Sequence, residues 1–169
     1  MTDLLEVAER RVPKSFSFDE MLKYHGPDFP GGVAHSFKVL QRALPLLTDG
    51  DPPERREIVI DTAFRGPGAR DGFELVTRAV TEDRYTVDPA MERRDRGRTL
   101  ERYVFKLSYR GRNVTLLIRE GFVVDEFIDL ARKEGRTAEE GARLTVLKQE
   151  MADRLFARPA EEVYDATVA

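Results

Sequence analysis

The sequence contains no cysteine. Disulfides, thiolate zinc sites, iron–sulfur clusters and thiol catalysis are therefore excluded, because each requires a cysteine sulfur. Histidine is scarce as well, with only His25 and His35 among 169 residues. A metal would need histidine and carboxylate ligands. We therefore expect no metal or other cofactor. If a divalent metal is bound, we expect His25 and either Asp28 or Asp61 as its ligands.

Long apolar runs are also missing. No stretch of about 18 apolar residues is present, and the N-terminal sequence MTDLLEVAERRVPKS lacks the apolar core of a secretion signal. We therefore expect a cytoplasmic protein that does not enter a membrane. The hydrophobic content of 41% and the absence of a linker predict a single domain over residues 1–169.

The net charge of −3 argues against a general nucleic-acid-binding protein. The charge is nevertheless uneven, because residues 84–119 contain ten basic and four acidic side chains. This excess suggests either a solvated face of a loop and strands or a wall that attracts an anion to a nearby site.

Two helices are predicted in the N-terminal part, about residues 17–48. Ser17 and Glu20 have the spacing of a capping box, so a short helix should run from Phe18 to about Tyr24 and stop at Gly26. From Gly31 onward, apolar residues recur at steps of three and four and predict a helix with one buried stripe. The stripe is Val33, Phe37, Leu40, Leu44 and Leu47.

The opposite side of this second helix carries a line of four residues, His35, Val39, Arg42 and Leu46. Its apolar members exceed what a solvated helix face usually shows, so the line predicts a homodimer contact or a pocket wall. In the simpler interpretation, His35 is a surface residue.

A mixed, mainly antiparallel sheet is predicted over about residues 55–120. The run Ile58-Val59-Ile60 is typical of a strand buried on both faces, and it leads into the glycine-rich segment RGPGARDGF and a helical pattern. That turn is either structural or a cradle for an anion. Segments 101–109 and 113–120 predict a hairpin, and the charged segment 88–98 predicts a mobile loop.

Two helices are predicted in the C-terminal part, about residues 123–157. The first should run from Val124 to Glu134 with Gly135 as its C-cap. Thr137 and Glu140 have the spacing of a second capping box, for a helix that ends at Phe156. The order of helices, sheet and helices predicts an α+β fold of one domain.

Candidate site residues cluster around the corner Tyr24–Gly32, where a kinked, glycine-rich segment holds His25 between two helices. Imidazole titrates near neutral pH, so His25 oriented by Asp28 or Asp61 is suited to acid–base catalysis. We expect His25 to lie in the principal pocket, with at least one of Asp28, Asp61 and Asp71 within reach. Arginines near the glycine turn could hold a carboxylate or phosphate through paired hydrogen bonds, although each alone could be a surface charge. The candidate substrate-binding residues are Thr62, Arg65, Arg70, Asp71, Glu74, Arg78 and Lys106. Asp71 could instead cap a helix, and His25 or His35 could ligate a haem.

Three segments carry a resemblance to a known family. In YHGPDFPGGVAHSFKVLQRAL, the His25-Gly26 and Pro30-Gly31 pairs match a signature of His-Gly and Pro-Gly that opens a helix. Asp61, Thr62 and Asp71 match an acid-Thr pair and an Asp in IDTAFRGPGARDGFELVTRAVTEDRYTV. The tail LKQEMADRLFARPAEEVYDA matches a closing helix and a short Pro-Ala-Glu-Glu element. The sequence thus resembles the FmdE-like family, whose members include a component of formylmethanofuran dehydrogenase.

The resemblance implies the fold of that family and a homodimer, and it also shows a departure. The family's second histidine falls on Pro27, and its cysteines fall on Phe29, Phe64 and Ala79. Of the metal ligands that the family's first motif implies, this chain keeps His25 alone, so an intact copy of that metal site is not expected.

Two classes of function remain open at this point. The first is a small-molecule enzyme or ligand-binding protein that uses His25 as its acid–base residue on an anionic substrate. The second is a non-catalytic metal-binding or accessory subunit that lost its cysteines and serves as an interaction module.

Overall fold

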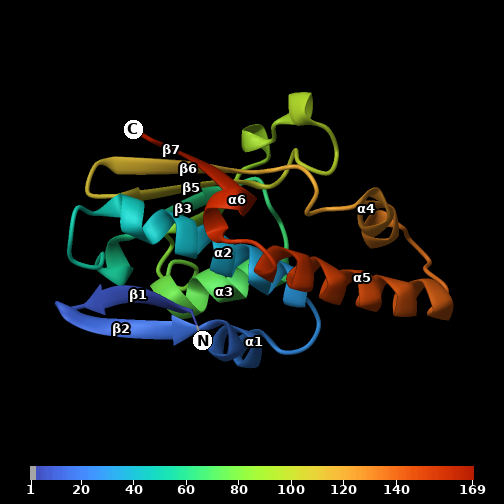
Figure 1. The fold of residues 1–169 in the computed structure, drawn as a ribbon, viewed down its shortest axis with the longest axis horizontal. Helices are drawn as coiled ribbons and strands as arrows, with labels where there is room; N and C mark the ends of the chain where they lie inside the picture. The colour runs from blue at the N-terminus through green and yellow to red at the C-terminus, as the bar shows by residue number, and fades with distance from the viewer. Residues whose placement is uncertain (1–2) are drawn as a thin grey trace.

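The computed structural model describes residues 3–169. It has an α+β fold in which a five-stranded mixed sheet, a layer of helices and a two-stranded hairpin are stacked in that order (Figure 1). Helices α4 (Asp125–Arg132) and α5 (Ala138–Phe156) extend to one side of this stack. The α+β class and the mainly antiparallel sheet were predicted from the sequence, and both predictions are confirmed.

The hairpin consists of β1 (Leu4–Glu9) and β2 (Val12–Ser17), and sequence analysis missed it. Leu5 and Val7 point into the core, whereas most of β2 is exposed. The chain reverses through Arg10 and Arg11, which both have positive φ angles. The Glu54 carboxylate accepts hydrogen bonds from both of their backbone amides, and so holds the turn from a distant segment.

Helix α1 (Phe18–His25) starts and stops as predicted. The Ser17 hydroxyl accepts a hydrogen bond from the Glu20 amide, and Gly26 ends the helix with a φ of 96°, a conformation that glycine adopts most readily. The corner that follows leads into α2 (Pro30–Leu47), the central helix of the fold.

Helix α2 is buried on most of its circumference because it packs against the sheet, α3 and α5. The predicted stripe from Val33 to Leu47 is buried, but so are Val39 and His35 on the other side, both at 0% exposure. Leu46 packs against the core, and Arg42 donates from Nε to the Tyr164 carbonyl. This side of α2 is therefore covered by the same chain, and the predictions of a dimer contact there and of a surface His35 are wrong.

The large sheet has the order β4-β3-β5-β6-β7. Its strands are β3 (Val59–Thr62), β4 (Tyr85–Val87), β5 (Val104–Tyr109), β6 (Arg112–Ile118) and β7 (Tyr164–Val168). Only β3 and β4 are parallel. The β5–β6 hairpin is confirmed. Helices cover one face of the sheet, so Ile60 is buried while Val59 is 37% exposed, and the prediction of a strand buried on both faces is wrong.

Helix α3 (Pro67–Thr77) takes up most of the predicted glycine turn. A Cβ atom on Gly68 would lie 2.6 Å from the Phe29 carbonyl oxygen, and one on Gly72 would lie 2.0 Å from Ser36 Oγ. These glycines therefore serve the close packing of α3 on α2. The structural interpretation of this segment fits Gly72, whereas Gly66 and Gly68 at the start of α3 also line a cavity, where an anion cradle stays a prediction.

Segment 88–103 is irregular but well connected, contrary to the predicted mobile loop. It contains the short helices η2 (Pro89–Met91) and η3 (Arg94–Arg96). The Arg93 amide donates to the Glu101 carbonyl, and the Arg96 guanidinium donates to the Ile118 carbonyl. The first bond closes the segment on itself, and the second fastens it to the end of β6.

The C-terminal part differs from its prediction at one helix end. Helix α4 stops at Arg132 with Lys133 as its C-cap, before the predicted Gly135. Helix α5 has the predicted capping box of Thr137 and Glu140 and ends at Phe156 as expected. A short helix η1 (Arg55–Glu57) precedes β3, and α6 (Ala160–Val163) leads into β7.

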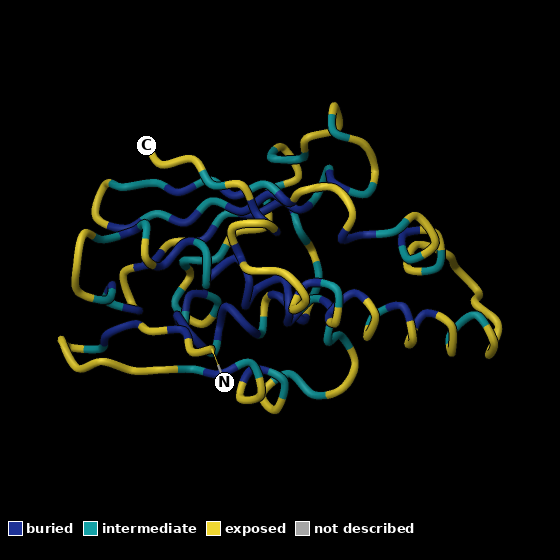
Figure 2. The backbone as a smooth tube through the Cα atoms, in the orientation of Figure 1, coloured by how far each residue is buried: buried dark blue, intermediate teal, exposed yellow. Residues whose placement is uncertain are grey.

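The core lies where α2 meets the sheet. Figure 2 shows buried backbone concentrated in these elements, while much of α5 is exposed. Across residues 3–169, every helix is too short or too polar to cross a membrane.

Candidate functional site

A cavity of about 260 Å³ lies where the first turns of α2 and α3 meet α4, α5 and residues 98–103. Its walls are mainly apolar and come from Phe29, Phe64, Tyr103, Phe127, Ile128 and Met151. Five basic side chains also line it, namely Arg65, Arg98, Arg102, Arg132 and Lys148. An apolar cavity with a few polar groups is the usual form of a small-molecule site.

His35 lies on the wall of this cavity and is fully buried. Its Nδ1 lies 2.8 Å from the Tyr164 hydroxyl and its Nε2 lies 3.1 Å from Met151 Sδ. A thioether only accepts hydrogen bonds, so we assign the proton to Nε2, and Nδ1 then accepts from Tyr164. Burial lowers the pKa of His35 to about 3. The imidazole is therefore neutral near pH 7 and is a poor general base there.

Three of the five cations are already paired. Arg98 is bonded to Asp125 and Asp129 of α4, at 2.9 and 2.6 Å. The two other pairs join Arg102 to Glu92 and Arg132 to Glu101, at 3.2 and 3.5 Å. These pairs fasten segment 92–103 to itself and to α4, and so help to shape the cavity.

Arg65 and Lys148 differ from these three, because neither forms an ion pair with any carboxylate among residues 3–169. Lys148 Nζ lies 4.0 Å from the centre of the Phe29 ring. Burial lowers the pKa of Lys148, while the charge of the exposed Asp28 raises it. The cavity thus has two cations with no anionic partner in the described chain.

The two helix N-termini at the cavity are uncapped. Phe29 and Gly66, the N-cap residues of α2 and α3, make no side-chain hydrogen bond to the helix, and neither first turn contains an acidic residue. A Cβ atom on Gly32 would lie 3.1 Å from the Ala69 nitrogen, so the two first turns are in contact. The first amides of a helix lack partners within it, and together with the helix dipole they favour a bound anion.

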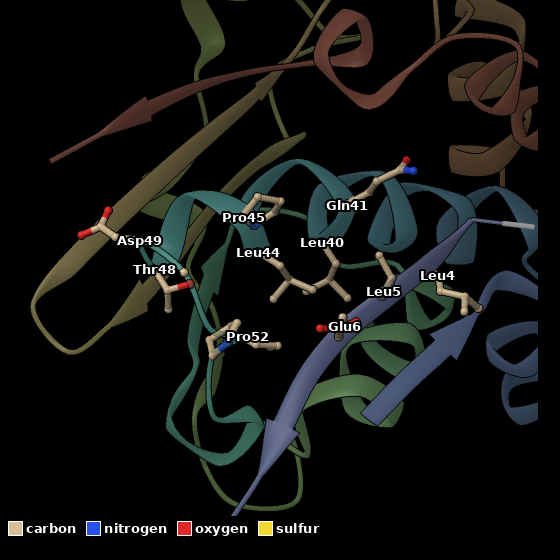
Figure 3. A pocket seen from close by; sticks show the side chains of 12 residues that line it. Leu4, Leu5, Glu6, Leu40, Gln41, Leu44, Pro45, Thr48, Asp49 and Pro52 are labelled. Carbon is tan, nitrogen blue, oxygen red and sulfur yellow. The ribbon is translucent and has the colours of Figure 1, made fainter. Parts of the chain in front are cut away.

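A larger cavity, of about 590 Å³, lies between β1 and the C-terminal half of α2 (Figure 3). Leu40 and Leu44 point into it, whereas Gln41 and Asp49 point away. Its lining contains no histidine, lysine or arginine. Despite its size, this cavity therefore has no basic side chain that could bind an anion.

Two further cavities lie beside the turn of the hairpin. Basic side chains line them, but so do carboxylates, which include Glu9, Glu54 and Glu57. The lining of the 260 Å³ cavity has basic side chains and no carboxylate. The 260 Å³ cavity is therefore the best candidate of the four.

His25 has the carboxylate partner that was predicted, but not the predicted location. Its Nδ1 lies 2.7 Å from Asp71 Oδ2 on α3, its side chain is 6% exposed, and its Nε2 is buried without a partner among residues 3–169. His25 lines none of the four cavities. The prediction that it lies in the principal pocket is wrong, because the end of α1 packs against α3. Asp71 lies inside α3 and is not an N-cap.

The other two predicted carboxylates do not join His25. Asp61 is opposite Lys106 in the register of β3 and β5, on the face of the sheet away from the helices. Asp28 is exposed in the corner, and its charge acts on Lys148. The proposed orientation of His25 by Asp28 or Asp61 is therefore replaced by orientation through Asp71.

Thr62 and Glu74 have structural roles. The Thr62 hydroxyl donates to the Val104 carbonyl and accepts from the Phe64 amide, so it fixes the exit from β3. The buried Glu74 carboxylate accepts hydrogen bonds from the amide and hydroxyl of Thr81, beyond the end of α3. Neither side chain lines the candidate cavity.

Of the predicted arginines, Arg65 alone lines the candidate cavity. Arg70 lies 3.8 Å from Asp71 and its side chain is 56% exposed. Arg78 caps α3 with a positive φ and lies 3.9 Å from Glu74. Lys106, on the open face of the sheet, is also outside.

The excess of positive charge in residues 84–119 is largely compensated by distant acidic residues. Such pairs join Arg110 to Glu57, Arg112 to Asp49 and Arg119 to Asp165, each at 2.8 to 2.9 Å. The prediction of an anion-attracting wall is therefore wrong for most of the segment. Of the ten basic residues in this segment, Arg98 and Arg102 alone line the cavity.

No cluster of three or more potential metal ligands of the His, Cys, Asp or Glu types occurs within the described part of the chain, residues 3–169. His35 could ligate a haem or a metal through Nε2 only after giving up its contact with Met151. In comparisons with known proteins, the sequence matches no family model and no curated protein. A proposal for the function therefore rests on the chemistry of the site.

Proposed function

We propose that this protein binds a small organic anion, with a carboxylate or phosphate group, in the cavity between α2, α3, α4 and α5. The observation that carries the proposal is the placement of Arg65 and Lys148, two cations without carboxylate partners among residues 3–169, beside two uncapped helix N-termini. Lys148 is partly buried, so leaving it unpaired costs free energy that a bound anion would offset. Arg65 is exposed and contributes its charge and hydrogen-bond donors to the lining.

Acid–base catalysis is the second candidate, and the His25–Asp71 pair favours it. Asp71 would accept the Nδ1 proton and so leave a lone pair on Nε2, which is buried and without a partner in the described chain. A histidine oriented in this way is equipped to take a proton from a substrate that reaches Nε2. His25 lies behind the cavity wall, with its ring centre 5.8 Å from that of Phe29, so this role requires the Phe29 ring to move when the anion binds. His25→Gln should then abolish turnover of the anion while its affinity changes less than about threefold. Unchanged turnover would refute this role.

The resemblance to the FmdE-like family gives the binding proposal separate support. Phe29 and Phe64, at two positions where that family has cysteines, both line the cavity. We therefore propose that this chain is related to that family. In this kinship the site lies at the same place in the fold, and apolar side chains line it where the family has cysteines. The homodimer and the alternative role as an accessory subunit also remain proposals.

Calorimetric titration with a carboxylate and with its neutral amide tests the binding proposal. We expect the carboxylate alone to bind, with an affinity that falls as salt rises. Lys148→Gln and Arg65→Gln should each weaken binding about tenfold, because a hydrogen bond to a charged group contributes about 1.5–3 kcal/mol. Lys106→Gln is the matched control, since it removes the same charge from outside the cavity.

Two outcomes would contradict the proposal. One is equal binding of the amide and the carboxylate. The other is an equal loss of affinity in Lys106→Gln and Lys148→Gln, which would show that only the net charge of the protein matters.

A further inference from the structure

Because cations and aromatic rings line the same cavity and its lining contains no carboxylate, we infer that its ligand is an amphipathic anion with one anionic head and a compact apolar body. This inference rests on the proposed function and names the class of ligand for the same site. The head would be a carboxylate or a phosphate ester, and the body would be about the size of one ring.

The two cations without an ion pair belong to the part of the lining where α2 and α3 begin. Arg65 directly precedes the N-cap Gly66 of α3, and Lys148 lies against Phe29, the N-cap of α2. Gly32 of α2 and Gly68 of α3 line the same cavity, and a Cβ atom on Gly32 would lie 3.1 Å from the Ala69 nitrogen, so the two first turns are in contact. An anionic head placed here would lie beside both cations and the starts of both helices.

The apolar part of the lining is formed by aromatic rings and by apolar residues of α4. The Tyr103 ring centre lies 4.8 Å from that of Phe64 and 4.7 Å from that of His35. Because the pKa of His35 is held at about 3, this imidazole presents no charge to a ligand near neutral pH. Phe127 and Ile128 of α4 line the same cavity. An apolar group gains free energy by leaving water for such surroundings.

The size of the cavity limits the ligand further. At about 260 Å³, it is smaller than the roughly 300–1,000 Å³ that sites for drug-sized ligands occupy. A nucleotide or a long acyl chain would exceed this volume, whereas a head joined to one ring suits it.

The test is a titration series on the full chain with matched ligands. It compares acetate with 3-phenylpropionate, inorganic phosphate with phenyl phosphate, and 3-phenylpropionate with 3-phenylpropionamide. We expect each phenyl anion to bind at least about tenfold more tightly than its small partner, because burial of a ring contributes about 1.5–3 kcal/mol. The amide should bind at least about tenfold more weakly than the acid. The preference between the two phenyl anions identifies the head.

Phe127→Ala should reduce the advantage of the phenyl anions over their small partners severalfold, whereas Val146→Ala, an exposed change on α5, should not alter it. Acetate and inorganic phosphate binding as tightly as the phenyl anions would overturn the ligand class and leave the proposed function intact. Absence of binding by every anion, or equal binding of the amide, would overturn both.

Discussion

The surroundings of His35 determine its protonation state, because burial lowers its pKa to about 3. It is enclosed by Met151, Tyr103 and Tyr164, so protonation would place an uncompensated charge in the core. The sequence pattern placed it on the less apolar side of α2, which suggested a surface residue. Only the packing of α5 and β7 around α2 reveals that it is buried.

We predict that His35 makes the protein less stable in acid. Its folded pKa of about 3 lies below the unfolded value near 6.5, so the unfolded state binds more protons between these values, and the free energy of unfolding falls as pH drops through this window. The slope from this residue should be at most about 1.4 kcal/mol per pH unit. Urea denaturation from pH 4 to pH 8 measures it.

His35→Gln is the matched variant, because glutamine does not titrate. Its free energy of unfolding should depend less on pH below pH 6 than that of the wild type. Parallel pH profiles of the two proteins would show that His35 is protonated as easily in the folded state as in the unfolded state.

His25 shows what the sequence does predict at the scale of single residues. Gly26-Pro27 predicted that His25 lies at an irregular corner between two helices. The neighbouring aspartates predicted that it has a carboxylate partner. The choice of Asp71 did not, because it depends on the angle at which α1 meets α3. Lys148 was missed, since a lone lysine on a polar helix carries no local signal of a cavity.

Capped helices were the elements most accessible to prediction. The capping box of Thr137 and Glu140 fixes the start of α5 through local hydrogen bonds, and Ser17 does the same for α1. The β1–β2 hairpin was not recognised, because its turn contains two arginines with positive φ and is held by the distant Glu54. Local sequence rules contain no such long-range contact.

At the same scale, Gly68→Ala should destabilise the packing of α3 against α2. The new methyl group would lie 2.6 Å from the Phe29 carbonyl oxygen and 3.0 Å from the Val33 nitrogen, so two backbones must separate. Overpacking of this kind costs about 1–3 kcal/mol. Chemical denaturation measures the change in the free energy of unfolding.

Gly141→Ala is the control for this substitution. Gly141 lies in α5 with nothing within 4 Å of an added Cβ atom, so alanine should stabilise the protein by about 0.5–1 kcal/mol through helix propensity. If Gly68→Ala also stabilises the protein, the close contact of α2 and α3 is not as described.

For the whole molecule, the burial of α2 changes what a mutation in it should do. Val39 has no exposed surface, so Val39→Glu would bury an unpaired carboxylate. We expect it to lower the free energy of unfolding by more than about 3 kcal/mol. Thermal unfolding combined with light scattering would measure stability and mass together.

The opposite result has a clear meaning for the assembly. If Val39→Glu keeps the melting temperature of the wild type and converts a dimer into a monomer, this side of α2 is an interface after all. A dimer of the wild-type protein in solution would be consistent with the proposed kinship, but would have to use another surface.

The proposed anion site is also a property of the whole molecule, because its parts come from α2, α3, α4, α5 and segment 98–103. The charge excess of residues 84–119 suggested an anion site, yet most of those arginines are neutralised by acidic residues elsewhere. The two cations of the cavity that stay unpaired within residues 3–169, Arg65 and Lys148, lie outside that segment. Only the folded arrangement distinguishes paired from unpaired charges.

The most direct test of the central claim is an NMR measurement of intermolecular nuclear Overhauser effects between 3-phenylpropionate and methyl groups of the protein. We predict contacts from the phenyl ring to the methyl groups of Ile128 and Met151, which line the candidate cavity. Contacts to Leu40 and Leu44 instead, in the larger cavity beside β1, would contradict the account. A ligand that gave no contacts at a saturating concentration would contradict it equally.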